Sequence, residues 1–161
     1  MHKCFLFIVV LISNFCCTQT DFVKRKSIFV ELAGSGGLGS LNYESSFFKK
    51  NKTELSWRAG LSFAPIDKNN GVGIVFPLLI NSLVGENSHK LELGIGQGFT
   101  ITTKGRFFIL TNAVVGYRFQ HERNNWFYRI SYTPLISYIV DFQVQQWAGI
   151  SIGYTFKKMP K

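Results

Sequence analysis

The chain has very little cysteine, and all of it lies near the N-terminus. Its three cysteines are Cys4, Cys16 and Cys17, within a segment whose pattern, described below, predicts removal on export. The mature chain is then expected to hold no disulfide, no thiolate metal site and no cysteine nucleophile. No cluster of other residues has the spacing of metal ligands, and no cofactor is predicted.

The sequence also lacks a hydrophobic run long enough to cross a bilayer as a helix. Its longest run begins at Phe5 and reaches at most Cys16, about twelve residues, whereas a spanning helix needs roughly twenty. His2 and Lys3 precede this run, and small or polar residues follow it. This order predicts a cleaved secretory signal peptide at residues 1–20. An uncleaved anchor is the weaker alternative.

Helical periodicity is nearly absent, and alternation with a period of two residues replaces it. The pattern predicts eight strands, at residues 28–35, 38–48, 54–63, 71–83, 90–101, 106–120, 126–133 and 147–156. Most links between them are short, as an antiparallel meander requires, and the longest is at about Leu135–Gln146. Pro77 predicts a bulge or kink within its strand.

The two faces of these strands differ in size as well as polarity. One face is rich in Leu, Ile, Phe, Tyr and Trp, and the other in Gly, Ser and Thr with a few charges. A solvated outer face would carry Lys, Glu and Gln throughout, whereas a narrow barrel lumen needs small residues around a few long ones. We therefore predict an all-β fold, an eight-stranded antiparallel up-and-down transmembrane β-barrel at 28–156, between a periplasmic segment at 21–27 and a basic tail at 157–161.

Aromatic residues support this arrangement, because membrane barrels place aromatic girdles at both interfaces. If both termini are periplasmic, one band is predicted near the periplasmic rim and a second near the opposite rim. The periplasmic band would contain Phe47, Tyr117, Phe119, Trp126, Tyr128, Tyr154 and Phe156. The opposite band would contain Phe63, Phe99 and Phe107.

The charges on the small face are predicted to form a network inside the lumen. An arginine that faces lipid at the midplane costs roughly 2–4 kcal/mol, so these residues should point inward. The predicted network contains Glu31, Glu44, Arg58, Glu92, Arg118 and Arg129, with Glu54 and Lys90 as further inward charges. Buried charges must compensate each other, so a structural plug is expected. A path for protons or a solute is the alternative.

The net charge of +9 comes partly from basic residues expected at the periplasmic rim. They are Lys24, Arg25, Lys26, Lys49, Lys50, Lys52, Lys157, Lys158 and Lys161. A solvated rim is expected, and phospholipid headgroups of the inner leaflet are the alternative partner. Nucleic-acid binding is not predicted, because no basic face interleaved with aromatics belongs to one soluble fold.

Two features that resemble functional motifs are assigned to turns. Gly34-x-Gly36-x-x-Gly39 matches a dinucleotide fingerprint, but a strand rather than the required helix follows it. His89 and His121 are expected in turns, and the residues next to them in sequence should face opposite sides. No catalytic residue is predicted.

Several segments resemble a group of small outer-membrane β-barrel proteins of Bacteroidetes-type, Gram-negative bacteria. They are Phe29–Leu32, Gly34–Gly37, Leu41–Glu44, Leu91–Gly94, Gly116–Phe119, Tyr132–Leu135 and Trp147–Phe156. The resemblance implies a porin-like or OmpA/OmpX-like barrel with no established activity for most members. The closing strand resembles the assembly signal of such barrels, although Lys157–Lys161 follow its terminal aromatic and Ser151 stands where that signal often has glycine.

The function predicted is therefore that of a non-enzymatic barrel in the bacterial outer membrane, with a structural, envelope or adhesion role. Its expected partners are the lipid bilayer, with lipopolysaccharide as a further candidate, and the outer-membrane barrel assembly machinery. No protein partner is predicted. Two alternatives stay open: a lipid-modifying outer-membrane enzyme, and a soluble periplasmic barrel that binds a small apolar ligand.

Overall fold

The computed structural model describes residues 24–67, 71–121, 123–137 and 142–156, which form ten β-strands. The strands are β1 (Lys26–Leu32), β2 (Gly39–Lys50), β3 (Thr53–Asp67), β4 (Gly71–Val84), β5 (His89–Thr102), β6 (Phe107–Phe119), β7 (Trp126–Tyr132), β8 (Leu135–Ser137), β9 (Gln143–Gln145) and β10 (Ala148–Phe156). No helix in these residues is long and apolar enough to cross a membrane.

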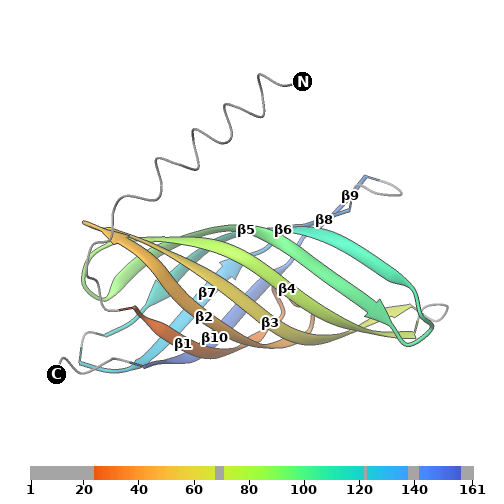
Figure 1. Ribbon diagram of the computed structural model, residues 1–161, viewed down its shortest axis with the longest axis horizontal. Coiled ribbons are helices and arrows are strands. Elements are labelled where there is room, and N and C mark those ends of the chain that lie inside the picture. The colour runs from red at the N-terminus through yellow and green to blue at the C-terminus, as the bar shows by residue number, and fades with distance from the viewer. Residues whose placement is uncertain (1–23, 68–70, 122, 138–141, 157–161) are drawn as a thin grey trace, which may run out of the picture.

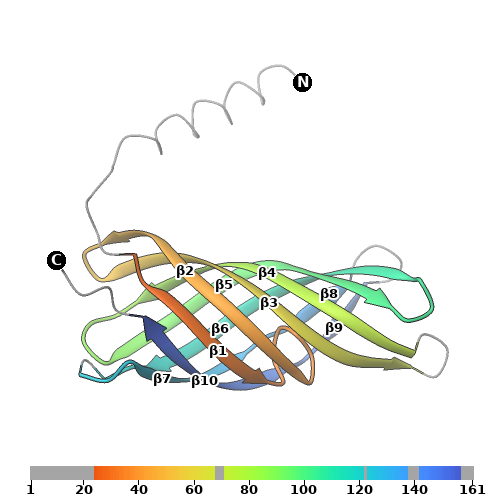
Figure 2. The same ribbon diagram turned by 60° about the horizontal axis from the view of Figure 1, so that its bottom comes forward.

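Eight of the strands form a closed ring (Figures 1 and 2). β1 pairs with β2 on one side and with β10 on the other, and the circuit runs through β3, β4, β5, β6 and β7. Every pairing is antiparallel. The fold class predicted from the alternation, an eight-stranded antiparallel barrel, is confirmed.

The two ends of the barrel are distinct. We call the end at which β1 begins and β10 ends the terminal rim; it also carries the β2–β3, β4–β5 and β6–β7 turns (Figures 1 and 2). The opposite end is the distal rim. The signal peptide and the tail at 157–161 lie outside the described residues, and both stay predictions.

The first strand lies earlier in the chain than predicted and begins at Lys26 rather than at residue 28. β1 ends at Leu32 rather than at residue 35. Ala33 and Gly34 have φ of +57° and +89°, a left-handed conformation that ends a strand. Gly37, with φ of +92°, turns the chain into β2.

Pro77, for which a bulge or kink is predicted, produces no bulge. The register of β4 against β5 runs without a shift from Gly73 to Val84, through Pro77 opposite Gly98. On the β3 side, the pairs at Ala59–Leu78 and Ser62–Val75 share one register, with the residues between them unpaired. Proline has no N–H to donate, so the ladder is interrupted there without an inserted residue. The shift in this hairpin lies between Pro65 and Asp67 instead.

The connection predicted at Leu135–Gln146 contains two short strands. β8 pairs with β6 beyond the end of β7, at Thr111–Ile136 and Asn112–Leu135, and β9 pairs with β8. Both are only three residues long, too short for alternation to reveal them. Figure 1 shows this β8–β9 hairpin at the distal rim.

The side chains of the wall alternate between the lumen and the outside. Burial in β1 and β7 switches at every residue. The inward side of β4 carries buried apolar residues, Val75, Leu79 and Leu83, and also the buried polar Asn81. Phe29 on β1 and Phe127 on β7 are buried as well, with ring centroids 5.7 Å apart.

Candidate functional site

The lumen holds a chain of ion pairs that joins opposite walls of the barrel. Glu31 on β1 is fully buried and accepts hydrogen bonds from Arg58 on β3 and from Arg129 on β7, the latter at 2.7 Å. The Nη1 atom of Arg129 donates to Oε1 of Glu92 on β5, also at 2.7 Å. Four predicted network residues, Glu31, Arg58, Glu92 and Arg129, therefore lie in one connected cluster.

A second cluster lies nearer the terminal rim. The Nη1 atom of Arg118 on β6 donates to Oε1 of Glu44 on β2 at 2.9 Å. The same carboxylate oxygen accepts a hydrogen bond from Arg25. The Nε atom of Arg25 donates to Oε1 of Glu54 at 2.7 Å. The remaining two predicted network residues, Glu44 and Arg118, therefore bond each other directly, and Arg25, which the sequence analysis placed at the solvated rim, connects Glu44 to Glu54.

Arg25 corrects the prediction that the whole basic run before β1 forms a solvated rim. Its side chain is only 13% exposed, and Nη1 also donates to Ser27 Oγ at 2.9 Å. Burial alone would lower the pKa of Arg25, but the carboxylates of Glu44 and Glu54 outweigh burial and raise it. The guanidinium is therefore charged, as an ion pair of this kind requires.

Aromatic rings lie against the buried guanidinium groups. The Cζ atoms of Arg58 and Arg129 lie 4.9 Å and 4.6 Å from the ring centroid of Phe29. Arg118 Cζ lies 3.6 Å from the ring centroid of Phe127. Because a cation over a desolvated ring face is attracted to it, these contacts help to stabilise charges that have left water. The buried guanidinium groups are therefore packed against aromatic rings as well as paired with carboxylates.

The two clusters contain equal numbers of carboxylates and guanidinium groups, and Lys90 belongs to neither cluster. The carboxylates are those of Glu31, Glu44, Glu54 and Glu92, and the guanidinium groups are those of Arg25, Arg58, Arg118 and Arg129. Lys90, which the sequence also placed inward, is half-buried and makes no ion pair with any residue that the structure describes.

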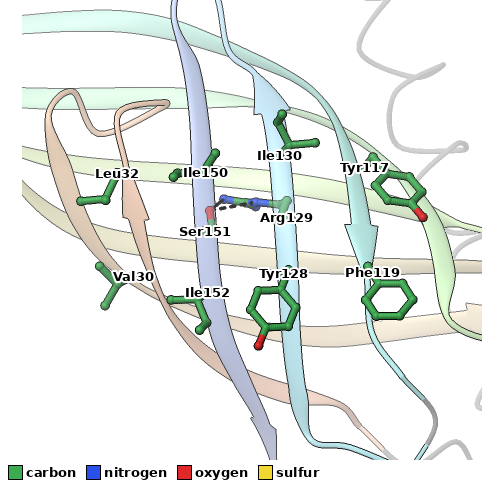
Figure 3. A pocket seen from close by; sticks show the side chains of 10 residues that line it. All are labelled: Val30, Leu32, Tyr117, Phe119, Tyr128, Arg129, Ile130, Ile150, Ser151 and Ile152. Atoms are coloured by element: carbon green, nitrogen blue, oxygen red, sulfur yellow. Dashed lines mark hydrogen bonds between the residues drawn. The ribbon is translucent and has the colours of Figure 1, made fainter.

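The outer wall has the opposite chemistry. Figure 3 shows part of it across β1, β10, β7 and β6, a shallow hollow of about 450 Å³ lined by Val30, Leu32, Ile130, Ile150, Ile152 and nearby aromatics. Arg129 lies between Tyr128 and Ile130 along its strand, yet its side chain points to the lumen. Its Nε and Nη2 atoms bond Ser151 Oγ at 3.3 Å and 3.1 Å (Figure 3). Adjacent residues of one strand thus meet two different environments.

Both predicted aromatic bands lie on this wall. Near the terminal rim, the ring centroids of Trp126 and Tyr154 are 5.6 Å apart, and those of Tyr154 and Phe156 are 5.4 Å apart. Towards the distal rim, the ring centroids of Phe99 and Phe107 lie 6.4 Å apart. These bands bracket the apolar wall at both ends.

The two described histidines lie at the terminal rim. His89 is the first residue of β5, and its Nδ1 shares a hydrogen bond with the Tyr117 hydroxyl. His121 follows β6, and its Nδ1 accepts a hydrogen bond from the backbone N–H of Arg123. Neither bond joins a histidine to a serine or a carboxylate. The described residues contain no group of three or more metal-ligating side chains placed to hold an ion.

Comparison with known proteins identifies the fold but no family. No protein-family model matches the chain, and no curated protein matches it. Among solved structures, the N-terminal β-barrel domain of Pseudomonas aeruginosa OprF is similar with a TM-score of 0.56 and 14% identity, over 83% of this chain and 96% of that one.

The Yersinia pestis outer-membrane protein Ail is also similar. Its structure in a phospholipid bilayer nanodisc gives a TM-score of 0.55 at 14% identity. The match covers 83% of this chain and 100% of that one. The crystal structure of Ail, the attachment invasion locus protein, gives a TM-score of 0.50 at 14% identity. The match covers 83% of this chain and 97% of that one. The chain therefore has the fold of small eight-stranded outer-membrane β-barrels. The narrower resemblance to proteins of Bacteroidetes-type bacteria stays a prediction.

Proposed function

We propose that this protein is an integral barrel of the bacterial outer membrane, with its apolar wall in the bilayer and its terminal rim on the periplasmic side. The observation that carries the proposal is the inverted distribution of polarity. Ile95, Ile130 and Ile150 are 58–63% exposed, whereas Arg58 and Arg118 are at most 1% exposed. Water would favour the reverse arrangement, and hydrocarbon favours this one.

The role that this arrangement supports is structural and non-enzymatic, with a plugged lumen. An eight-stranded barrel leaves an interior that side chains can fill. Here the ion pairs of Glu31 and Glu44 and the rings of Phe29 and Phe127 lie across that interior. A solute would have to break buried ion pairs to pass, and removing one partner of such a pair costs about 3–5 kcal/mol.

Membrane placement is tested by fractionation and by spin labels at two neighbouring positions. The full chain should be recovered in the outer-membrane fraction and show heat-modifiable gel migration. A label at Ile150 should be relaxed by oxygen dissolved in lipid, whereas a label at Ser151 should be shielded. If the Ile150 label is instead accessible to a water-soluble quencher, the proposed placement is wrong.

The plug is tested by swelling of liposomes that contain the purified barrel. Arabinose and larger sugars should produce no swelling above that of empty liposomes, while a general porin in parallel vesicles shows that the assay detects flux. Appreciable swelling would contradict the plug and support the alternative solute path.

The two other predicted functions have less support. A soluble barrel for an apolar ligand needs its apolar face inward, but the inward face carries the charges. A lipid-modifying enzyme would need a histidine beside a serine or carboxylate, but His89 and His121 bond other groups. Lipid A analysis after overexpression remains the direct test for the enzyme. Contacts with lipopolysaccharide and the assembly machinery belong to the same proposal as membrane placement.

Adhesion is a second candidate role, and the β8–β9 hairpin is the observation that favours it. The hairpin lies at the distal rim, which the proposed orientation turns outward, and Phe142 and Val144 beside or within β9 are 77% and 41% exposed. Cells that express the barrel should adhere to an epithelial monolayer, and the double variant F142S/V144S should lose this adherence. Equal adherence of both strains would exclude the hairpin as the contact.

A further inference from the structure

A second hollow lies at the terminal rim, between the β2–β3 and β4–β5 turns. It has a volume of about 470 Å³. The two turns lie at the same end of the barrel as the start of β1 (Figures 1 and 2). Its lining is polar: Lys49, Asn51, Lys52, Thr53, Glu54, Glu86, Asn87 and Lys90, with Leu83 and Gly85. This composition differs from that of the apolar wall and calls for a different occupant.

The carboxylates in this hollow are already paired. Glu54 accepts a hydrogen bond from Arg25 at 2.7 Å, and Glu86 pairs with Lys52 at 2.9 Å. Lys49 and Lys90 make no ion pair with any described residue. The hollow therefore has a surplus of positive charge.

Lys90 is the less solvated of these two lysines. It is half-buried and lies directly opposite Arg118 in the β5–β6 register, so two cations face each other across strands. Like charges in that relation repel each other. Arg118 makes an ion pair with Glu44 at 2.9 Å, whereas Lys90 makes none with a residue that the structure describes. An anion beside Lys90 would relieve this repulsion.

The backbone holds the two turns of the hollow together. The N–H of Gly85 donates to the carbonyl oxygen of Lys52 at 3.0 Å, which ties the β4–β5 turn to the β2–β3 turn. Gly85 has φ of +155°, and a Cβ there would lie 2.9 Å from Lys90 Cα. Only glycine fits this close approach, so the backbones of the two turns are held together before a ligand arrives.

We propose that this hollow binds a phosphate group through Lys49 and Lys90. Lysine ammonium groups bind phosphate as point charges with several donors, and Thr53, Asn51 and Asn87 supply neutral donors around them. The group could belong to a free phosphate ester in the periplasm or to the headgroup of an anionic phospholipid at the rim. Only the lipid source rests on the proposed membrane placement.

The test uses the purified full chain in dodecyl maltoside, at constant ionic strength, with sn-glycerol 3-phosphate and inorganic phosphate as probes. Isothermal titration calorimetry should give saturable binding of one equivalent. The variants K90Q and K49Q should each weaken it at least tenfold, and K90R should retain it. The matched control is K50Q, which removes the same charge from the same rim outside the hollow.

Three results would overturn the site: no saturable binding, equal weakening by K50Q and K90Q, or full binding by both K49Q and K90Q. Heat-modifiable migration of each variant shows separately that its barrel is folded, and it does not depend on the anion.

A second arm identifies the source of the phosphate. Barrels are released from nanodiscs of phosphatidylglycerol or of phosphatidylcholine and examined by native mass spectrometry. If the source is a headgroup, phosphatidylglycerol should stay bound to the unmodified barrel and be lost from K90Q. If glycerol phosphate binds but neither lipid is retained, the site takes a free phosphate ester.

Discussion

Replacing Arg129 by methionine should destabilise the barrel by about 3–5 kcal/mol, the cost of breaking a buried ion pair by removing one partner. Arg129 bonds Glu31 and Glu92 at 2.7 Å each. After the change, Glu31 keeps its bonds from Arg58 and Ser35. Among the described residues, Glu92 keeps the side-chain amide of Asn81, at 3.1 Å, as its hydrogen-bond donor. Most of the cost therefore arises at Glu92, a buried carboxylate that loses its ion pair with Arg129 and has none with another described residue.

This origin of the cost can be isolated by a second substitution. In the R129M background, E92Q removes the unpaired charge, so the double variant should regain at least half of the lost stability, because a neutral amide is far easier to bury than a carboxylate. The free energy of unfolding would be measured in urea with the chain folded into phosphatidylcholine vesicles, followed by tryptophan fluorescence. At about 4 kcal/mol, the unfolding equilibrium constant changes roughly a thousandfold.

The matched control for R129M is R123M, because Arg123 is exposed at the terminal rim and makes no ion pair with any described residue. It should change stability by less than about 0.5 kcal/mol. The reasoning would be refuted by a loss below about 1 kcal/mol for R129M, or by a double variant no more stable than R129M alone.

Two further predictions concern the wall and the packing of the lumen. Ile95 is 63% exposed in the middle of β5, and Ile95→Arg should lower the free energy of unfolding in vesicles by roughly 2–4 kcal/mol. The control Leu38→Arg, in the turn after β1, should lower it little. Equal losses in the two variants would argue against a hydrocarbon belt around the wall. Gly153→Ala should cost about 1–3 kcal/mol by overpacking, since a Cβ there would collide with the Cβ atom of Phe29 and lie 2.5 Å from Phe127 Cζ. Unchanged stability in urea unfolding would contradict this tight packing.

The sequence predicted the wall well because one physical rule governs it. Residues that alternate along a strand face opposite sides, so the position of Arg58 or Arg118 between apolar neighbours was enough to orient it. The same rule also marks Arg25, which has the same parity as Ser27 and Glu31 in β1. Its place in a basic run, three residues before the predicted strand, instead favours the rim.

Other features depend on information that alternation does not carry. β4 is apolar on both sides, so its sequence alone could not show that Val75, Leu79 and Leu83 fill the lumen. The β8–β9 hairpin has only three residues in each strand, and its pairing depends on how far β6 extends beyond β7. The partners of each buried charge depend on the shear of the closed sheet, which brings Glu31 to Arg129 across 98 residues of sequence.

The pairing of β1 with β10 has a consequence for how the barrel is made. β1 emerges early during synthesis, but the strand that completes its second edge, from Ala148 to Phe156, emerges more than a hundred residues later. Until then an open row of N–H and C=O groups is available for the wrong neighbour. Glu31, on that same strand, also lacks its ion pair until Arg129 has been made. A chain truncated within β10 should therefore fail as a whole instead of forming a smaller ring, and its exposed edge would mark it for a chaperone or a protease.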